Sequence, residues 1–367
     1  MIALFETDHK NIDRYYLNHD ELKNQFETNN VLVIFNSFKE KYRFSKINKS
    51  QSDHLYNLSK HIDNIDVLII NGNRIPDIYI STIAKKRGIP VIYIQHGPHS
   101  HKRPRQLTFY ISNFLKVIAH LLISAKIAFE LKSFLFCYKI ILIQFFTGGS
   151  RVGHLTKHYS PNTSYVFSEY YKKWHEKYYF GHLTKYKLIG NKDALLKKVV
   201  LKNHLIFCHQ TLVEDGRLEF KVFKQQLESI RIFGENNNLA LCVKTHPRIS
   251  DKLKNYYKKN GWIIHEDLET IPIGSVTIGF YSSLLAFWAF NKIPVISINL
   301  PTKEDVPSEI REYCICADLN EIKELKLDII TSDLDVNKLS KKADYFFNFT
   351  GTQELELNIL NFKRSIK

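Results

Sequence analysis

The chain has 367 residues, of which 44% are hydrophobic and 24% are charged. At roughly 150 residues per domain, this length corresponds to two or three domains. The balance of apolar and charged residues is that of a globular protein, and it excludes a peptide hormone, a small zinc module and a disordered tail. The 52 basic and 37 acidic side chains give a formal net charge of +15, which favours anionic partners such as phosphorylated donors, nucleic acid or an anionic membrane surface.

The chain begins without the basic start and the long apolar stretch of a secretion signal. No run reaches the roughly 18 uncharged apolar residues of a membrane-spanning helix. The five cysteines are odd in number, and several stand in apolar runs where a reduced thiol behaves as a small hydrophobic side chain. These features predict a cytoplasmic protein.

Short apolar runs in the first half of the chain predict a parallel sheet. They are rich in β-branched or aromatic residues, and most end at Gly, Asn, Ser or His, which is typical of strands. We predict strands at residues 2–6, 31–35, 67–71, 91–95, 165–168 and 187–190, and helices at 77–87 and 169–179. Because strands that alternate with helices imply right-handed crossovers, residues 1–191 are expected to form a Rossmann-like N-terminal domain.

Residues 108–147 form an apolar, aromatic insertion within that domain. At 100° per residue, Lys116, His120, Lys126 and Glu130 fall within one arc of about 120°, which predicts two consecutive amphipathic helices with a break between them. Such helices could lie in the plane of a membrane, with lysines toward anionic headgroups. They could equally form a hairpin packed on their own domain, and the sequence leaves both alternatives open.

The alternation of strands and helices resumes in the second half. We predict strands at residues 204–208, 240–244, 275–278 and 294–298, and helices at 218–233 and 282–290. We expect a hinge at 192–203, a second domain at 204–350 and a C-terminal helix at 351–367. The predicted fold class is therefore α/β, with two Rossmann-like domains.

Two adjacent carboxylates, Glu214 and Asp215, follow the strand at 204–208 and precede Gly216. Ligands of open α/β sheets bind just outside the carboxyl ends of strands, and a carboxylate placed there can act as general base toward a hydroxyl. We favour Asp215 as the base, because it lies next to the glycine at which the backbone turns. The alternative is an ordinary helix start, where acidic residues complement the macrodipole.

The next strand ends in a basic segment that contains Lys244, His246, Pro247 and Arg248. Its imidazole can donate a hydrogen bond or a proton to a leaving oxygen, while the two cations suit a phosphate. The alternative is an ordinary basic turn.

A third motif consists of Gly279, Ser282 and Ser283, between a strand and an apolar helix. Two hydroxyls and unpaired backbone N–H groups at a helix start can bind a phosphate, although serine is also simply a good N-cap. His246 follows Asp215 by 31 residues and Ser282 follows His246 by 36, so three successive crossovers would place the motifs at one edge of the sheet.

These three motifs resemble those of bacterial sialyltransferases of the GT-B fold, particularly the lipooligosaccharide sialyltransferase and capsular polysialyltransferase families. The resemblance implies two Rossmann-like domains facing an interdomain cleft, with the N-terminal domain on the acceptor side. It also implies that the acidic pair supplies the base, that His246 acts as acid or phosphate ligand, and that the serines bind the phosphate of CMP. The expected reaction transfers sialic acid from CMP-sialic acid to a hydroxyl of a capsule, lipooligosaccharide or O-antigen glycan.

The first domain carries a further resemblance, in residues 93–98 and 167–170. These segments are similar to features of capsule and teichoic-acid transferases that use CMP-Kdo or CDP-polyol donors, so such a donor is an alternative. We expect Gln95, His96 and Gly97, at a strand end, to bind the acceptor.

A glycosyl bond to phosphate breaks through an oxocarbenium-like centre, and a leaving group with one phosphate needs less neutralisation than a diphosphate. We read Asp333 and Asp335 as part of a solvated loop, and the histidines near His96 lie among cations that oppose metal binding. The expectation is inverting transfer without a metal or cofactor.

A different class of function, nucleic-acid binding, is suggested by the net charge and the 20 tyrosines. The chain shows no helix-turn-helix, RNP or zinc-finger pattern, and many of its aromatic residues stand in apolar runs typical of cores. We therefore expect a nucleotide-sugar donor and a glycan acceptor as partners, no nucleic acid, and peripheral association with the cytoplasmic face of the inner membrane.

Overall fold

The computed structural model describes residues 2–6, 31–35, 52–54, 61–72, 75–95, 97, 160–300 and 307–354, together with isolated helical positions between 118 and 139. The chain divides into two compact units. The first comprises Met1–His96, Phe114–Ile189 and Gln353–Lys367, and the second comprises Gly97–Asn113 and Gly190–Thr352.

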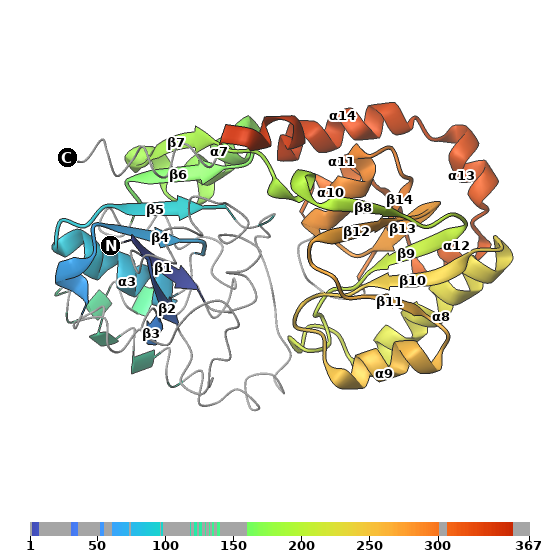
Figure 1. Ribbon diagram of the computed structural model, residues 1–367, viewed down its shortest axis with the longest axis horizontal. Helices are drawn as coiled ribbons and strands as arrows, with labels where there is room; N and C mark the ends of the chain where they lie inside the picture. The colour runs from blue at the N-terminus through green and yellow to red at the C-terminus, as the bar shows by residue number, and fades with distance from the viewer. Residues whose placement is uncertain are drawn as a thin grey trace. The chain divides into compact units, whose positions relative to one another are not determined.

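A parallel sheet forms the centre of the first unit (Figure 1). Among the described residues its strand order is β3-β2-β1-β4-β5-β6-β7. The bounds are Ile2–Glu6 for β1, Val31–Phe35 for β2, Ser52–His54 for β3, Val67–Ile70 for β4, Val91–Ile94 for β5, Thr163–Val166 for β6 and Lys185–Leu188 for β7. Every residue of β4, β5 and β6 is buried, as expected for a parallel sheet covered on both faces.

Two helices that connect neighbouring parallel strands pack on this sheet. The helix α3 (Ile75–Lys86) packs beside β4 and β5, and α7 (Glu169–Tyr178) packs beside β6 and β7. Short 3-10 helices occupy Ile62–Asn64 and Gly181–Leu183. The side chain of Ser168 accepts a hydrogen bond from the Tyr171 N–H and caps α7, which is why β6 ends two residues earlier than predicted.

The core of the first unit encloses His175 of α7. Its ring lies 5.3 Å from that of Tyr93 and 4.9 Å from that of Tyr179, with Trp174 and Phe180 also in contact. Because this site excludes water, burial lowers the pKa of His175 to about 3. The imidazole is therefore neutral in the folded protein at neutral pH.

The second unit contains a second parallel sheet, with the order β11-β10-β9-β13-β14-β15 among the described residues. The bounds are His204–Cys208 for β9, Ala240–Lys244 for β10, Ile263–His265 for β11, Val276–Gly279 for β13, Val295–Ile298 for β14 and Ile315–Ala317 for β15. From β9 the chain first builds outward through β10 and β11, and it then returns to β13 on the other side of β9. The switch point of the sheet therefore lies at β9, where ligands of open α/β sheets bind.

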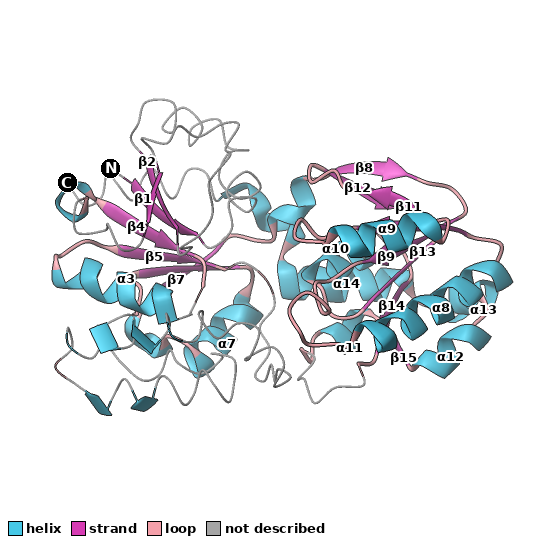
Figure 2. Ribbon diagram, turned by 90° about the horizontal axis from the view of Figure 1, so that it is seen from below, coloured by secondary structure: helices cyan, strands magenta, loops and turns pink. Residues whose placement is uncertain are grey.

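The helices of the second unit follow its strands. They are α8 (Phe220–Asn236), α9 (Asp251–Lys259), α10 (Ser283–Phe290), α11 (Ile310–Tyr313), α12 (Leu319–Glu324), α13 (Leu327–Asp333) and α14 (Val336–Phe347), with 3-10 helices at Lys192–Leu195 and Phe349–Glu354. Figure 2 shows α8 and α12 side by side. The helix α10 is apolar after its first residue and packs between β13 and α14, and the five side chains from Leu285 to Ala289 are buried.

A glycine lets α10 approach the sheet closely. A Cβ built on Gly279 would lie 2.9 Å from Leu285 Cδ2 and 3.1 Å from Cys208 Cβ, both closer than ordinary contacts. A larger residue at the end of β13 would therefore require the side chains of Leu285 and Cys208 to shift.

The predicted α/β fold class is confirmed. The strands β1, β2, β9 and β10 begin and end at the predicted residues. The segment 192–203, expected as a hinge, carries a 3-10 helix and the strand β8 (Lys197–Val200), which pairs in parallel with β12 (Thr270–Ile273). Within the expected loop at Asp333 and Asp335, Asp333 ends α13 and Asp335 caps α14 by accepting a hydrogen bond from the Lys338 N–H.

Two other expectations fall partly on residues outside the described part. The described positions of the insertion 108–147, which include Leu121, Leu122 and Phe129, are mostly helical. Residues 355–367 of the predicted C-terminal helix lie outside the description. None of the helices in the described ranges has the length and apolar character needed to cross a membrane.

Candidate functional site

The three motifs leave the second sheet at the same level. In the strand register, Cys208 at the end of β9 aligns with Lys244 at the end of β10 and with Gly279 at the end of β13. The loops that follow these three residues therefore start side by side at the carboxyl edge of the sheet, on both sides of the switch point.

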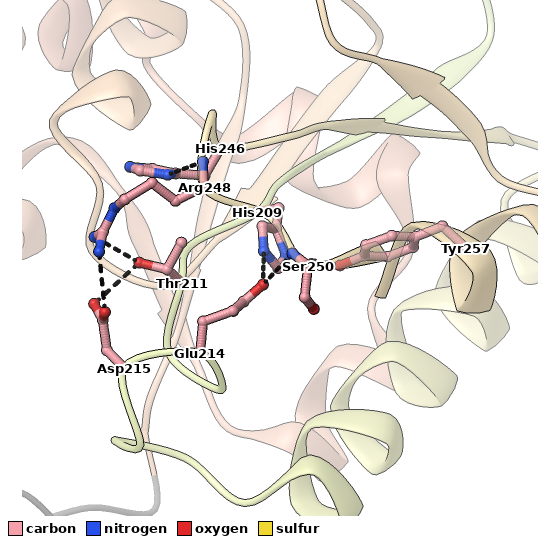
Figure 3. Close-up of polar contacts among 8 residues, drawn as sticks. All are labelled: His209, Thr211, Glu214, Asp215, His246, Arg248, Ser250 and Tyr257. Carbon is pink, nitrogen blue, oxygen red and sulfur yellow. Dashed lines mark hydrogen bonds and ion pairs between the residues drawn. The ribbon is translucent and has the colours of Figure 1, made fainter. Parts of the chain in front are cut away.

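Hydrogen bonds join these loops to one another. The Gln210 side-chain oxygen accepts a hydrogen bond of 3.0 Å from the Tyr281 N–H, which ties the loop after β9 to the loop after β13. The guanidinium of Arg217 lies over the Tyr281 ring, 5.1 Å from its centre. The acidic pair and the His-Pro segment are joined by further contacts, shown in Figure 3.

Asp215 is held by Thr211 and Arg248 in a closed arrangement, which we call the Asp215 cycle. The Arg248 guanidinium donates to Asp215 Oδ1 at 3.2 Å and to Thr211 Oγ1 at 3.2 Å. The Thr211 hydroxyl in turn donates to Asp215 Oδ2 at 3.0 Å. Both carboxylate oxygens are therefore engaged, although the Asp215 side chain is still 24% exposed and that of Arg248 is 48% exposed.

Glu214 points away from the Asp215 cycle, toward α9 (Figure 3). Its Oε1 accepts a hydrogen bond of 3.0 Å from the Ser250 N–H and lies 3.6 Å from His209 Nε2. Burial by itself would raise the pKa of Glu214, but the contacts with His209 and the Ser250 N–H outweigh burial and lower it. Glu214 is therefore a fixed carboxylate that joins the loop after β9 to the start of α9.

The side chain of His209 lies next to that of Glu214 and is fully buried. Its Nδ1 is 3.0 Å from the hydroxyl of Tyr257 on α9. Burial raises the pKa of Tyr257 well above its usual value, so the phenol keeps its proton and can donate it to Nδ1. We accordingly assign the imidazole proton to Nε2, where it faces the Glu214 carboxylate.

His246 is oriented by its own backbone. Its Nδ1 accepts a hydrogen bond of 3.1 Å from the Arg248 N–H, two residues further along the chain. Because Nδ1 is an acceptor, the neutral ring carries its proton on Nε2. The ring is partly exposed, so this N–H can serve as a hydrogen-bond donor at the sheet edge.

Lys244, which was predicted to suit a phosphate, contacts the loop after β11. Its side chain is nearly buried, and the ammonium donates to the backbone carbonyl of Asp267. The ammonium thus joins the loop after β11 to the end of β10. It also contributes, after burial, to lowering the pKa of His265.

Ser282 is the N-cap of α10, because its Oγ accepts a hydrogen bond of 3.2 Å from the Leu284 N–H. Ser283 is the first residue of the helix and is half-buried. The N-terminus of α10 therefore opens at the carboxyl end of β13, a position whose partial positive charge suits an anion. Pro247 lies in the loop after β10, between His246 and Arg248.

The predicted acceptor residues belong to a different part of the chain. Gln95 is buried, and its side-chain oxygen accepts a hydrogen bond of 2.9 Å from the Phe167 N–H, so it ties the end of β5 to the segment after β6. His96 lies outside the described residues, and Gly97 groups with the second unit.

Sequence reasoning did not single out His209, Gln210, Thr211, Ser250 and Tyr257. The first three directly follow β9 in the segment that carries the acidic pair, so their position was a usable signal. Tyr257 lies on α9, a helix that was not predicted because its sequence is highly charged. The spacing of its buried residues Leu253 and Tyr257, four apart, is the one helical signal in that segment.

Comparison with known proteins supports the architecture. No protein-family model matches the chain, and no curated protein matches its sequence. Among solved structures, the wall teichoic acid polymerase TagF, determined with CDPG, is 12% identical, with 99% of this chain and 89% of that chain covered and a TM-score of 0.53. The chain has the GT-B fold.

Two further structures have the same architecture at similarly low identity. The UDP-GlcNAc 2-epimerase of Methanocaldococcus jannaschii, in complex with UDP-GlcNAc and UDP, is 14% identical, covers 98% of this chain and 99% of its own, and has a TM-score of 0.51. The glycotransferase of kitacinnamycin is 10% identical, covers 99% and 98% of the two chains, and has a TM-score of 0.52. At these identities the likeness concerns the fold.

Proposed function

We propose that this protein is a glycosyltransferase that moves sialic acid from CMP-sialic acid to a hydroxyl of a cell-surface glycan. The observation that carries the proposal is the common level at which the three motifs leave the sheet. Asp215, His246 and the N-terminus of α10 follow β9, β10 and β13, whose last residues are in register around the switch point. A base, a hydrogen-bond donor and an anion site are the parts that glycosyl transfer from a phosphate requires.

In the proposed reaction, Asp215 accepts the proton of the acceptor hydroxyl as its oxygen forms the new glycosidic bond. The bond between the sugar and the phosphate oxygen breaks with its electron pair, which leaves on CMP. The Nε2–H of His246 donates to that phosphate, and the N–H groups at the start of α10 with Ser282 and Ser283 bind its other oxygens. One displacement of this kind inverts the configuration at the sugar carbon and calls for no metal or cofactor.

The assignment of Asp215 as the base is supported by the contacts of its neighbour. Glu214 is bound by a backbone N–H and faces His209, so moving it would leave the Ser250 N–H before α9 and buried polar groups unpaired. Asp215 is held by side chains alone and is more exposed. A general base must be reached by the incoming hydroxyl and must lose its present partners, so the more exposed Asp215, held by side chains, fits this role.

The donor sugar has one rival assignment, a CMP-Kdo or CDP-polyol donor. It is suggested by residues 93–98 and 167–170, and TagF, which has the same architecture, was determined with CDPG. Incubation of the protein with CMP-sialic acid, CMP-Kdo and CDP-glycerol separately, in EDTA, distinguishes these donors by the nucleotide released. We expect CMP from CMP-sialic acid. Release only with Mg²⁺, or steep salt-dependent DNA binding without release from any donor, would contradict the proposal.

We also propose peripheral association of the insertion with an anionic membrane surface. Six large apolar side chains at its described positions are between 46% and 78% exposed: Leu121, Leu122, Phe129, Phe134, Leu135 and Tyr138. Lys126, Lys132 and Lys139 are exposed on the same stretch. Apolar residues that enter the headgroup region and lysines that face anionic lipid are the pattern of interfacial helices.

A further inference from the structure

The Asp215 cycle leaves the proposed base occupied. A general base must bring a carboxylate oxygen within about 2.6–3.2 Å of the hydroxyl that it deprotonates. In the Asp215 cycle, Oδ1 accepts from Arg248 and Oδ2 accepts from Thr211, at 3.2 and 3.0 Å. An acceptor hydroxyl that approaches Asp215 therefore meets a carboxylate already paired with a cation.

We propose that Arg248 is a positioning residue that holds Asp215 while the donor is absent and transfers its guanidinium to the donor phosphate when the donor binds. Donor binding then releases a carboxylate oxygen for the acceptor hydroxyl. This inference rests on the proposed function, and it adds that the base becomes available only after the phosphate has arrived.

The attachment of Arg248 suits such a transfer. Its backbone is fixed, because the Arg248 N–H donates to His246 Nδ1, whereas its guanidinium is half-exposed and makes single hydrogen bonds of 3.2 Å to Asp215 and to Thr211. Partly exposed ion pairs of this length are weak, since water screens both partners. A phosphate offers several anionic oxygens and can form two parallel hydrogen bonds with a guanidinium, so it competes effectively for Arg248.

The surroundings favour Arg248 over the other cation of the same segment. Lys244 is nearly buried and already donates to the Asp267 carbonyl. Arg248, by contrast, comes two residues after His246, whose Nε2–H is the proposed donor to the same phosphate. One short loop after β10 would therefore supply both a neutral donor and a movable cation.

Glu214 offers a useful contrast. It accepts from the Ser250 N–H and lies beside His209, whereas Arg248 pairs with its neighbour Asp215. Displacement of Arg248 would therefore free Asp215 and leave its neighbour in place, so that the acidic pair divides into one structural and one released carboxylate.

The test is a double-mutant cycle on CMP affinity, measured by calorimetry at low salt for the full chain. Asp215→Asn removes the charge that competes for Arg248, and we expect it to tighten CMP binding about two- to fivefold. Arg248→Gln is expected to weaken CMP binding at least tenfold. In the Arg248→Gln background, Asp215→Asn is expected to give no gain, because the cation for which Asp215 competes is gone.

Comparing the effect of Asp215→Asn in the wild type and in Arg248→Gln separates release of Arg248 from simple repulsion between Asp215 and the phosphate. An equal gain from Asp215→Asn in both backgrounds, or no gain in either, would overturn the inference and leave the proposed function intact. Wild-type protein that binds neither CMP nor the three donors would overturn the proposed function itself. Glu228→Gln is the matched control, because it removes one of the two carboxylates that pair with Arg231 on α8, and it should leave CMP affinity unchanged.

Discussion

The carboxylates of Glu214 and Asp215, adjacent in the chain, are held by different partners. Glu214 accepts from the Ser250 N–H at 3.0 Å, whereas Asp215 accepts from the Arg248 guanidinium at 3.2 Å (Figure 3). Ser250 and Arg248 belong to the same loop, so the acidic pair contacts that loop at two points, one for each carboxylate. The pair thereby fixes the segment in which His246 lies.

Exchanging the two carboxylates for amides should separate their roles. We expect Asp215→Asn to lower kcat by about 10² to 10⁴ with little change in thermal stability, because it removes the proposed base and keeps the shape of the side chain. Glu214→Gln should mainly lower the melting temperature, because its buried oxygen faces His209 and the start of α9. Steady-state kinetics and thermal melts of both variants make the comparison. A larger loss of kcat in Glu214→Gln would reverse the assignment.

His246 can be tested with a variant that keeps its turn. The side-chain oxygen of asparagine can occupy the place of Nδ1 and accept from the Arg248 N–H, but asparagine lacks the Nε2–H. We therefore expect His246→Asn to keep its melting temperature and to lose about 10² to 10⁴ in kcat. Retention of full activity would show that the imidazole is not the donor to the leaving phosphate.

Burial of His175 predicts a pH-dependent stability. The pKa of His175 is about 3 in the folded protein and about 6.5 in an unfolded chain, so between these values the unfolded state binds a proton that the folded state does not. Its contribution to the free energy of unfolding should therefore fall by about 1.4 kcal/mol for each pH unit as the pH drops from 6.5 toward 3.

The matched variant is His175→Phe, which fits an aromatic site and cannot be protonated. Denaturant unfolding at several pH values should show a shallower loss of stability in this variant than in the wild type. Parallel curves for the two proteins would mean that His175 does not titrate as its burial requires.

Membrane association can be measured by flotation with vesicles. Protein should float with vesicles that contain anionic lipid and remain behind with neutral ones, because the exposed lysines attract anionic headgroups. Phe129→Ser together with Phe134→Ser should reduce flotation several-fold, since both side chains are more than 75% exposed. The paired control is Lys172→Gln with Lys173→Gln on α7, which should leave flotation unchanged. Equal flotation of the wild type and all variants would contradict membrane binding through the insertion.

Local sequence signals located most of the strands and the positions of the three motifs. The runs at β9 and β10 are apolar and β-branched and end at polar residues, so their limits are visible without tertiary information. The strand β6 was predicted to begin at residue 165 because Thr163 and Ser164, with which it begins, are polar, although both are buried. The strand β8 was missed because it is only four residues long and begins with two lysines, which leaves Val199 and Val200 as its whole apolar signal.

The order of strands and motifs in the chain was enough to predict a parallel sheet whose carboxyl edge gathers Asp215, His246 and Ser282, because parallel strands end on one side. The partners of each side chain were decided only by the tertiary structure. Lys244 turns to Asp267, 23 residues away, and Glu214 to Ser250, 36 residues away. Such choices depend on how packed loops orient neighbouring side chains, and two adjacent carboxylates with the same local propensities carry no sequence signal that tells one from the other.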